Sequence, residues 1–113
     1  MKRAVMPLLF VGCLMATPSW AACSLPAPPA QFPDGAEVER ADMARLRQQL
    51  ERYLDEQGRF FKCLDAMEKT ARGTGYDSEE RRVDRIARYN AAMAEMYEAI
   101  NRFNDEVQRF NQR

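Results

Sequence analysis

Residues 43–71, MARLRQQLERYLDEQGRFFKCLDAMEKTA, decide the fold of this chain. Nearly all the side chains at alternating steps of three and four residues are apolar, the spacing of a helix that packs against another helix. Gln57 is the one polar member of the series. The series is Met43, Leu46, Leu50, Tyr53, Gln57, Phe60, Leu64, Met67 and Ala71. We therefore expect a long helix from about Ala36 that presents this seam to a partner helix.

A second long helix is predicted after a break at residues 72–77. Gly73 suits a left-handed cap at the end of the first helix. Asp77, with Glu80 three residues further on, resembles a capping box at the start of the second. The same alternation of steps then gives a second seam, made of Val83, Ile86, Asn90, Met93, Tyr97, Ile100, Asn104, Val107 and Asn111. Because the loop is short, residues 36–113 are predicted to form an all-α, antiparallel two-helix hairpin.

Beside the predicted second seam runs another row with a seven-residue period, called here the 89–110 row. Its members are Tyr89, Met96, Phe103 and Phe110. A two-helix hairpin covers only one row of each helix, so this row needs a cover from elsewhere. We interpret it as a binding surface for a partner chain or for the segment that precedes the hairpin.

Three asparagines, Asn90, Asn104 and Asn111, interrupt the predicted second seam. Polar residues in a helical seam cost stability and fix the register or the number of helices. We expect these asparagines to set the register, and contact with a ligand is the alternative.

Residues 1–21 have the organisation of a secretory signal peptide. Lys2 and Arg3 precede an uncharged apolar stretch, residues 4–16, and Ser19-Trp20-Ala21 provides small residues at a cleavage site. A membrane-spanning helix needs about 20 apolar residues, so this stretch is too short to be an anchor. We expect the mature chain in the periplasm of a Gram-negative envelope or secreted. Lipidation of Cys23 is the alternative, and it is the only route to a membrane that we foresee.

Residues 22–35 form a proline-rich segment, called here the arm, that is expected to be extended. At about 3.1 Å per residue the arm is long enough to run back along the first helix and place Cys23 beside Cys63. Two cysteines in an exported chain favour a disulfide, with free thiols or a lipid on Cys23 as the alternatives. If the arm also covers the 89–110 row, the protein is a monomer rather than a homodimer.

The composition argues against several classes of function. Lys plus Arg is 17 and Asp plus Glu is 17, so nucleic acid binding lacks an electrostatic basis. The chain has no histidine, so it lacks the commonest metal ligand and the usual base for a cysteine nucleophile. Adjacent carboxylates such as Asp55 and Glu56 point in different directions on a helix. We expect no metal, no cofactor and no enzymatic activity.

The chain resembles a family of small exported proteobacterial helical proteins of unassigned function. The resemblance rests on Cys23-x-x-Pro26 to Pro33-Asp34-Gly35, then Met43, Tyr53, Cys63-Leu64, Tyr89-Asn90 and Phe103-Asn104. It implies no activity, cofactor or catalytic residue. The expected function is that of a non-enzymatic exported structural or protein-interaction module. A holdase-like chaperone, or an accessory protein of envelope stress, is the alternative.

Overall fold

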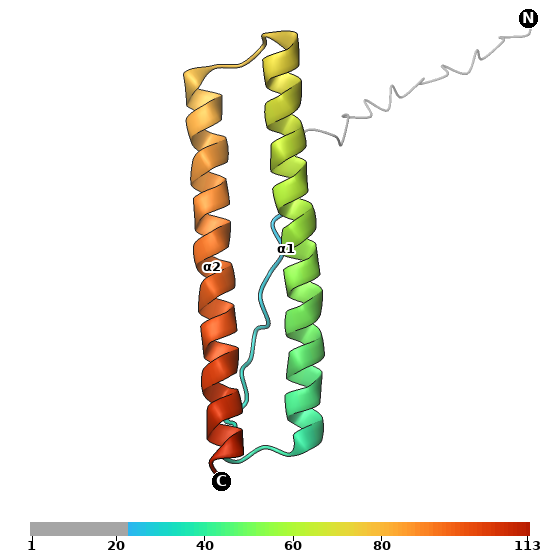
Figure 1. Cartoon of the computed structure of the whole chain (residues 1–113), viewed down its shortest axis with the longest axis vertical. Helices are drawn as coiled ribbons and strands as arrows, with labels where there is room; N and C mark the ends of the chain where they lie inside the picture. The colour runs from blue at the N-terminus through green and yellow to red at the C-terminus, as the bar shows by residue number, and fades with distance from the viewer. Residues whose placement is uncertain (1–22) are drawn as a thin grey trace, which may run out of the picture.

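The structure, a computed structural model, describes residues 23–113, which form two long antiparallel helices and an extended segment (Figure 1). Helix α1 spans Arg40–Thr74 and helix α2 spans Glu79–Asn111. The predicted all-α hairpin is confirmed. The predicted signal peptide, residues 1–21, lies outside the described residues, as does Ala22. Within residues 23–113 neither helix has an apolar stretch long enough to cross a membrane.

The seam predicted for α1 is confirmed along most of its length. The seven seam residues from Met43 to Leu64 are buried, and they include the polar Gln57. Met67 and Ala71 are only half-buried, because they lie nearer the loop than Cys63, the point where the arm reaches α1. Leu50, Tyr53 and Phe60 provide the large side chains of the core.

The start of α1 differs from the expected boundary at Ala36. The carbonyl of Asp34 accepts hydrogen bonds from the backbone N–H groups of Glu37 and Val38, and the Asp34 carboxylate accepts one from Ala36. These bonds hold residues 34–38 in a turn, so the helix begins only at Arg40. Glu39 precedes it without a side-chain cap.

Both predicted caps at the loop are displaced along the chain. Gly73 is helical, and the left-handed cap is Gly75, with φ of 71°. Ser78 rather than Asp77 caps α2, because the Ser78 hydroxyl accepts the backbone N–H of Arg81. The predicted capping box is therefore wrong, and Asp77 pairs instead with Arg85.

The seam predicted for α2 is wrong. The buried residues of α2 are Arg85, Ala92 and Ala99, which are seven residues apart. Ala92 packs against Phe60 and Leu64, and Ala99 lies in the cluster of Leu50 and Tyr53. Small side chains on α2 thus accommodate large side chains on α1 at close approach. Of the predicted seam, Val83, Ile86, Asn90, Tyr97, Asn104 and Asn111 are exposed, and Met93, Ile100 and Val107 are half-buried.

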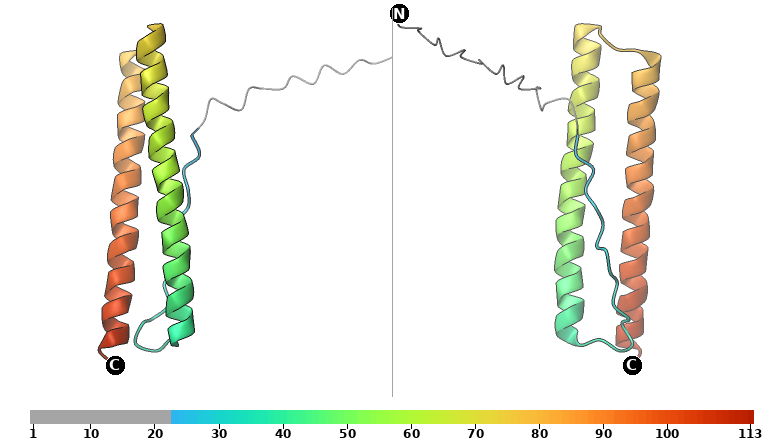
Figure 2. Two further views of the ribbon diagram at one scale, coloured as in Figure 1. Left: turned by 45° about the vertical axis from the view of Figure 1, so that its right-hand side comes forward. Right: turned by 180° about the vertical axis from the view of Figure 1, so that it is seen from behind.

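The arm lies along one side of the helix pair, as its length predicted. It starts beside Cys63, runs between the two helices and reaches the C-terminal end of α2, where the chain turns toward the start of α1 (Figure 2). Phe32 packs against the cluster of Leu50, Tyr53 and Ala99. The arm therefore completes a core to which three segments contribute.

The turn after the arm is fixed to the end of α2. The backbone N–H of Gly35 donates a hydrogen bond of 2.6 Å to the Glu106 carboxylate. The Asp34 carboxylate pairs with the Arg109 guanidinium at 2.9 Å. Gly35 lies so close to α2 that an added Cβ would overlap the backbone carbonyl of Glu106. Only glycine fits at this position.

We predict that Gly35→Ala detaches the turn and lowers the free energy of unfolding by about 1–3 kcal/mol, because the backbone of α2 cannot move aside. The matched control is Gly58→Ala, since nothing lies within 4 Å of a Cβ at that helical position. The control is expected to gain about 0.5–1 kcal/mol. Urea unfolding followed by circular dichroism measures both. Equal stability of the two variants would contradict the close approach of Gly35 to α2.

Candidate interaction site

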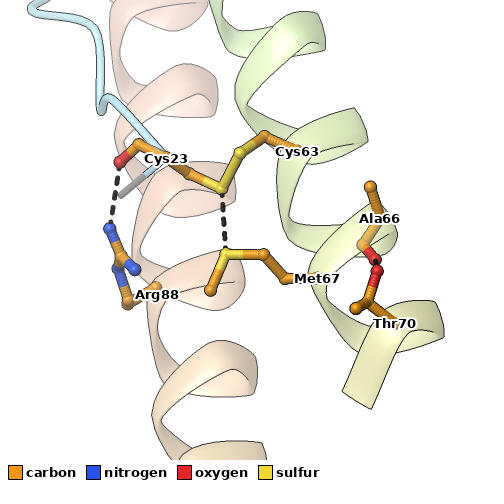
Figure 3. Close-up of a disulfide and its surroundings, with 6 residues drawn as sticks. All are labelled: Cys23, Cys63, Ala66, Met67, Thr70 and Arg88. Carbon is orange, nitrogen blue, oxygen red and sulfur yellow. Dashed lines mark hydrogen bonds between the residues drawn. A yellow bond between two sulfur atoms is a disulfide. The ribbon is translucent and has the colours of Figure 1, made fainter. Parts of the chain in front are cut away.

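The disulfide joins the start of the arm to the middle of α1. Cys23 and Cys63 are bonded, with 5.7 Å between their Cα atoms (Figure 3). The Arg88 guanidinium of α2 donates a hydrogen bond of 3.1 Å to the Cys23 carbonyl and lies 5.7 Å from the ring centroid of Phe60. The Met67 sulfur is 3.2 Å from the Cys23 sulfur, a packing contact, because a disulfide sulfur carries no hydrogen. The disulfide end of the arm is therefore held by both helices.

We predict that the exported chain is about 2 Da lighter before reduction than after it, as one disulfide requires. Cys63→Ser should retain most of the helix signal, since the seam is unchanged. It should lose at most about 4 kcal/mol, the chain-entropy value for a closed loop of 40 residues. Intact-mass spectrometry and thermal unfolding measure these effects. Free thiols at both positions, or complete unfolding of Cys63→Ser at room temperature, would contradict the prediction.

The loop end of the hairpin is closed by an ion pair. The Arg85 guanidinium makes two hydrogen bonds to the Asp77 carboxylate, at 3.1 and 2.8 Å. The two side chains are 10% and 22% exposed. The hydrogen bonds from Arg85 lower the pKa of Asp77, because they stabilise its charged form. Arg85 thus fills the position in the α2 seam that alanine fills at residues 92 and 99.

We predict that acid weakens this end of the hairpin. The Asp77 pKa is lower in the folded chain than its unfolded value of about 3.9, so the contribution of the pair is present above that pH. It is lost as the pH falls through the folded pKa. Asp77→Asn should lower stability at pH 7 and reduce the loss between pH 7 and pH 2.

The matched control is Asp84→Asn, an exposed carboxylate on α2 with no ion pair among the described residues. Thermal unfolding from pH 2 to pH 7 compares the three proteins. An acid-induced loss in Asp77→Asn as large as that of the parent would contradict the prediction.

A second polar pair lies inside the core and takes no part in a surface site. The Gln57 amide donates a hydrogen bond of 2.9 Å to the Tyr53 hydroxyl, and both side chains are buried. Burial raises the pKa of Tyr53, because it disfavours the phenolate. The Gln57 carbonyl oxygen has no partner among the described residues. This pair is a polar feature of the seam, where Tyr53 and Gln57 meet at positions i and i+4.

Three of the four members of the 89–110 row are half-buried, and Tyr89 is 44% exposed. Tyr89 packs on Phe61 of α1, with ring centroids 4.8 Å apart. Met96 and Phe103 pack against the cluster around Leu50. Phe110 is half-buried, as are Met96 and Phe103. The arm makes its polar contacts with α2 through Arg88, Glu106 and Arg109, none of which belongs to the 89–110 row. The expectation that the 89–110 row lines the groove of the arm is wrong for Tyr89, which faces α1.

Three of the six large apolar side chains that are exposed within residues 23–113 belong to the row predicted as the α2 seam; the other three are Leu25, Tyr76 and Tyr89. Val83, Ile86 and Tyr97 are 54%, 51% and 56% exposed. They belong to a set of thirteen positions without a charged residue, called here the outward face of α2. The set is Val83, Ile86, Ala87, Asn90, Met93, Ala94, Tyr97, Ile100, Asn101, Asn104, Val107, Gln108 and Asn111.

The outward face of α2 differs from a normal solvent-exposed helix face. Exposed helix faces carry charged and polar residues, as α1 does with Glu51, Asp55, Arg59 and Lys62. The predicted register residues Asn90, Asn104 and Asn111 all lie on the outward face of α2, exposed. They therefore do not set the register of the hairpin itself. An uncharged row on an exposed helix is a candidate interaction surface.

The sequence contained two signals for this arrangement. One is the placement of Ala92 and Ala99 at the seven-residue spacing of Arg85, which gives the row of small residues that faces α1. The other is the absence of charge from the row of Val83, Ile86 and Tyr97. Side-chain size alone favours the row of Val83, Ile86 and Tyr97 as the seam of α2, because these side chains are larger than alanine.

Comparison with family models, with curated proteins and with solved structures found no match to this chain. The resemblance to small exported proteobacterial proteins stays a prediction. Across residues 23–113 no group of three or more Cys, Asp or Glu side chains is placed to hold a metal ion.

Proposed function

We propose that the chain is a non-enzymatic protein-interaction module of an oxidising compartment outside the cytoplasm. The single observation that supports this function is the outward face of α2, which extends from Val83 to Asn111 without a charged residue and is exposed at ten of its thirteen positions. Leaving this much apolar surface in water is unfavourable unless a partner covers it. The arm, the loop and α1 hold α2 so that this face points outward.

The proposed compartment is the periplasm or the extracellular space. The Cys23–Cys63 disulfide supports it, because such bonds persist in oxidising surroundings. The sequence pattern of residues 1–21 supports export independently of the disulfide. The bond of Cys23 to Cys63 supports a disulfide rather than a lipid at this residue.

Crosslinking of the mature protein in an envelope extract tests the proposed function. We compare the parent chain with Tyr97→Lys, which places a charge in the middle of the outward face. The matched control is Gln48→Lys, which places the same charge at an exposed position of α1. Crosslinks that persist in the control and disappear in Tyr97→Lys are expected. Identical crosslinks in all three proteins would contradict the proposed function.

A holdase-like chaperone remains the second candidate, since exposed apolar side chains on α2 are also what an unfolded client would bind. The two functions differ in selectivity. A holdase delays the aggregation of many unrelated unfolded proteins, whereas an interaction module recognises one surface. Light scattering of heat-denatured client proteins with the parent chain and with Tyr97→Lys separates them. Broad protection that Tyr97→Lys abolishes would favour the holdase.

A further inference from the structure

We propose that the partner of the outward face of α2 is a second copy of this chain, docked in parallel through the same face. This inference rests on the proposed function, because it names the partner of the same surface. The result is a two-fold symmetric dimer in which the two α2 helices form a coiled coil and each α1 lies on the outside.

The spacing of the face is that of a coiled coil. The exposed series alternates steps of three and four residues over four heptads, which is the pattern that packs one helix against another. In heptad notation, Val83, Asn90, Tyr97, Asn104 and Asn111 take the a positions, and Ile86, Met93, Ile100 and Val107 take the d positions. Every d position is apolar. Within the hairpin, α1 packs mainly on a different row of α2, which contains Ala92 and Ala99. Every a position of the repeat is exposed, and three of the four d positions are half-buried.

The lack of charge on the face favours a second copy as the occupant. In many coiled coils, charged residues beside the seam choose the partner and its direction. Here the flanking e positions are Ala87, Ala94, Asn101 and Gln108. The opposite flank begins with Arg82, which pairs with Glu79, and continues as the 89–110 row, which packs within the hairpin. A neutral face gives no attraction to a charged partner surface, and it fits an identical neutral face without repulsion. The charges of α2 lie on other rows, where Arg88 and Arg109 contact the arm.

The asparagines specify the parallel direction. In a parallel, in-register pair each a residue faces its own copy, so Asn90 meets Asn90 and Asn104 meets Asn104, and the amides can hydrogen-bond to each other. In an antiparallel pair each a residue faces a d residue. Each asparagine would then face isoleucine, methionine or valine and leave its amide unpaired, at a cost of about 1–3 kcal/mol if buried.

The size of the face suits a weak, reversible dimer. The face is about 42 Å long at 1.5 Å per residue, and a helix with side chains is about 10–12 Å wide. Two such faces together bury on the order of 1,000 Å², near the lower limit for a specific protein interface. The asparagine layers lower the affinity further. We therefore expect a dimer whose population depends on protein concentration.

Sedimentation equilibrium of the oxidised mature chain over a range of concentrations tests the dimer. The parent chain should show a monomer–dimer equilibrium. Tyr97→Lys should raise the dimer Kd by at least about tenfold, because two like charges meet in the central layer. Asn90→Val should lower Kd by about tenfold, since a β-branched residue at an a position favours two-stranded packing. Gln48→Lys is the matched control and should leave Kd unchanged.

Oxidative crosslinking tests the direction. A cysteine introduced as Asn104→Cys should form an intermolecular disulfide, because the two copies of residue 104 face each other in the parallel dimer. In an antiparallel pair in which Tyr97 faces Ile100, these residues lie about 17 Å apart along the helix axis, at 1.5 Å per residue. Gln48→Cys, on the exposed side of α1, is the matched control and should not crosslink.

Three results would overturn the inference. The first is a parent chain that stays monomeric at all concentrations, and the second is a dimer that Tyr97→Lys does not weaken. The third is a dimer in which Asn104→Cys fails to crosslink. Another outcome is a monomeric chain in which Tyr97→Lys still abolishes crosslinks to a different protein in the envelope extract. In that case the proposed function stands, and only the proposal that the partner is a second copy of this chain is wrong. If those crosslinks are also unaffected, the proposed function fails as well.

Discussion

The fold depends on one constraint: the arm is fixed at both of its ends across the pair of helices. One end is the Cys23–Cys63 disulfide, where Arg88 donates a hydrogen bond to the backbone carbonyl of Cys23. The other is the turn at Gly35, which touches the backbone of α2 and is held by Glu106. Two long helices alone bury only one row each, and a small domain with so thin a core gains stability from additional links. The arm provides that link, and Phe32 adds a third wall to the core of Leu50, Tyr53 and Ala99.

This constraint determines which rows of α2 remain exposed. The row with Ala92 and Ala99 faces α1, and the row with Arg88 and Arg109 faces the arm. The 89–110 row also packs against α1, as Tyr89 does on Phe61. The row with Val83, Ile86 and Tyr97 is left exposed. Its neutrality over the whole helix is the reason to assign it a partner.

Much of the fold could be predicted from the sequence. The α1 seam follows from the spacing of large apolar residues, and the placement of Cys23 beside Cys63 follows from the lengths of the arm and the helix. The choice of seam in α2 could not be made from spacing, because two rows share the same period. Packing decided it: the large residues of α1, such as Tyr53 and Phe60, need small residues opposite them, and alanine is weakly hydrophobic by itself. For the same reason the partner-binding surface predicted from the sequence is the 89–110 row, whereas the surface proposed from the structure is the row of Val83, Ile86 and Tyr97. Predicting its position required knowing which rows the arm and α1 occupy.

The most direct test of the account is a set of proton–proton nuclear Overhauser effects in the oxidised chain. The ring of Phe32 should show effects to Leu50 on α1 and to the methyl group of Ala99 on α2, because these side chains belong to one cluster. Contacts from the arm to both helices at once occur only if it lies between them as described. Effects from Phe32 to neither helix, with the disulfide formed, would show that the arm is tethered but not packed, and would contradict the account.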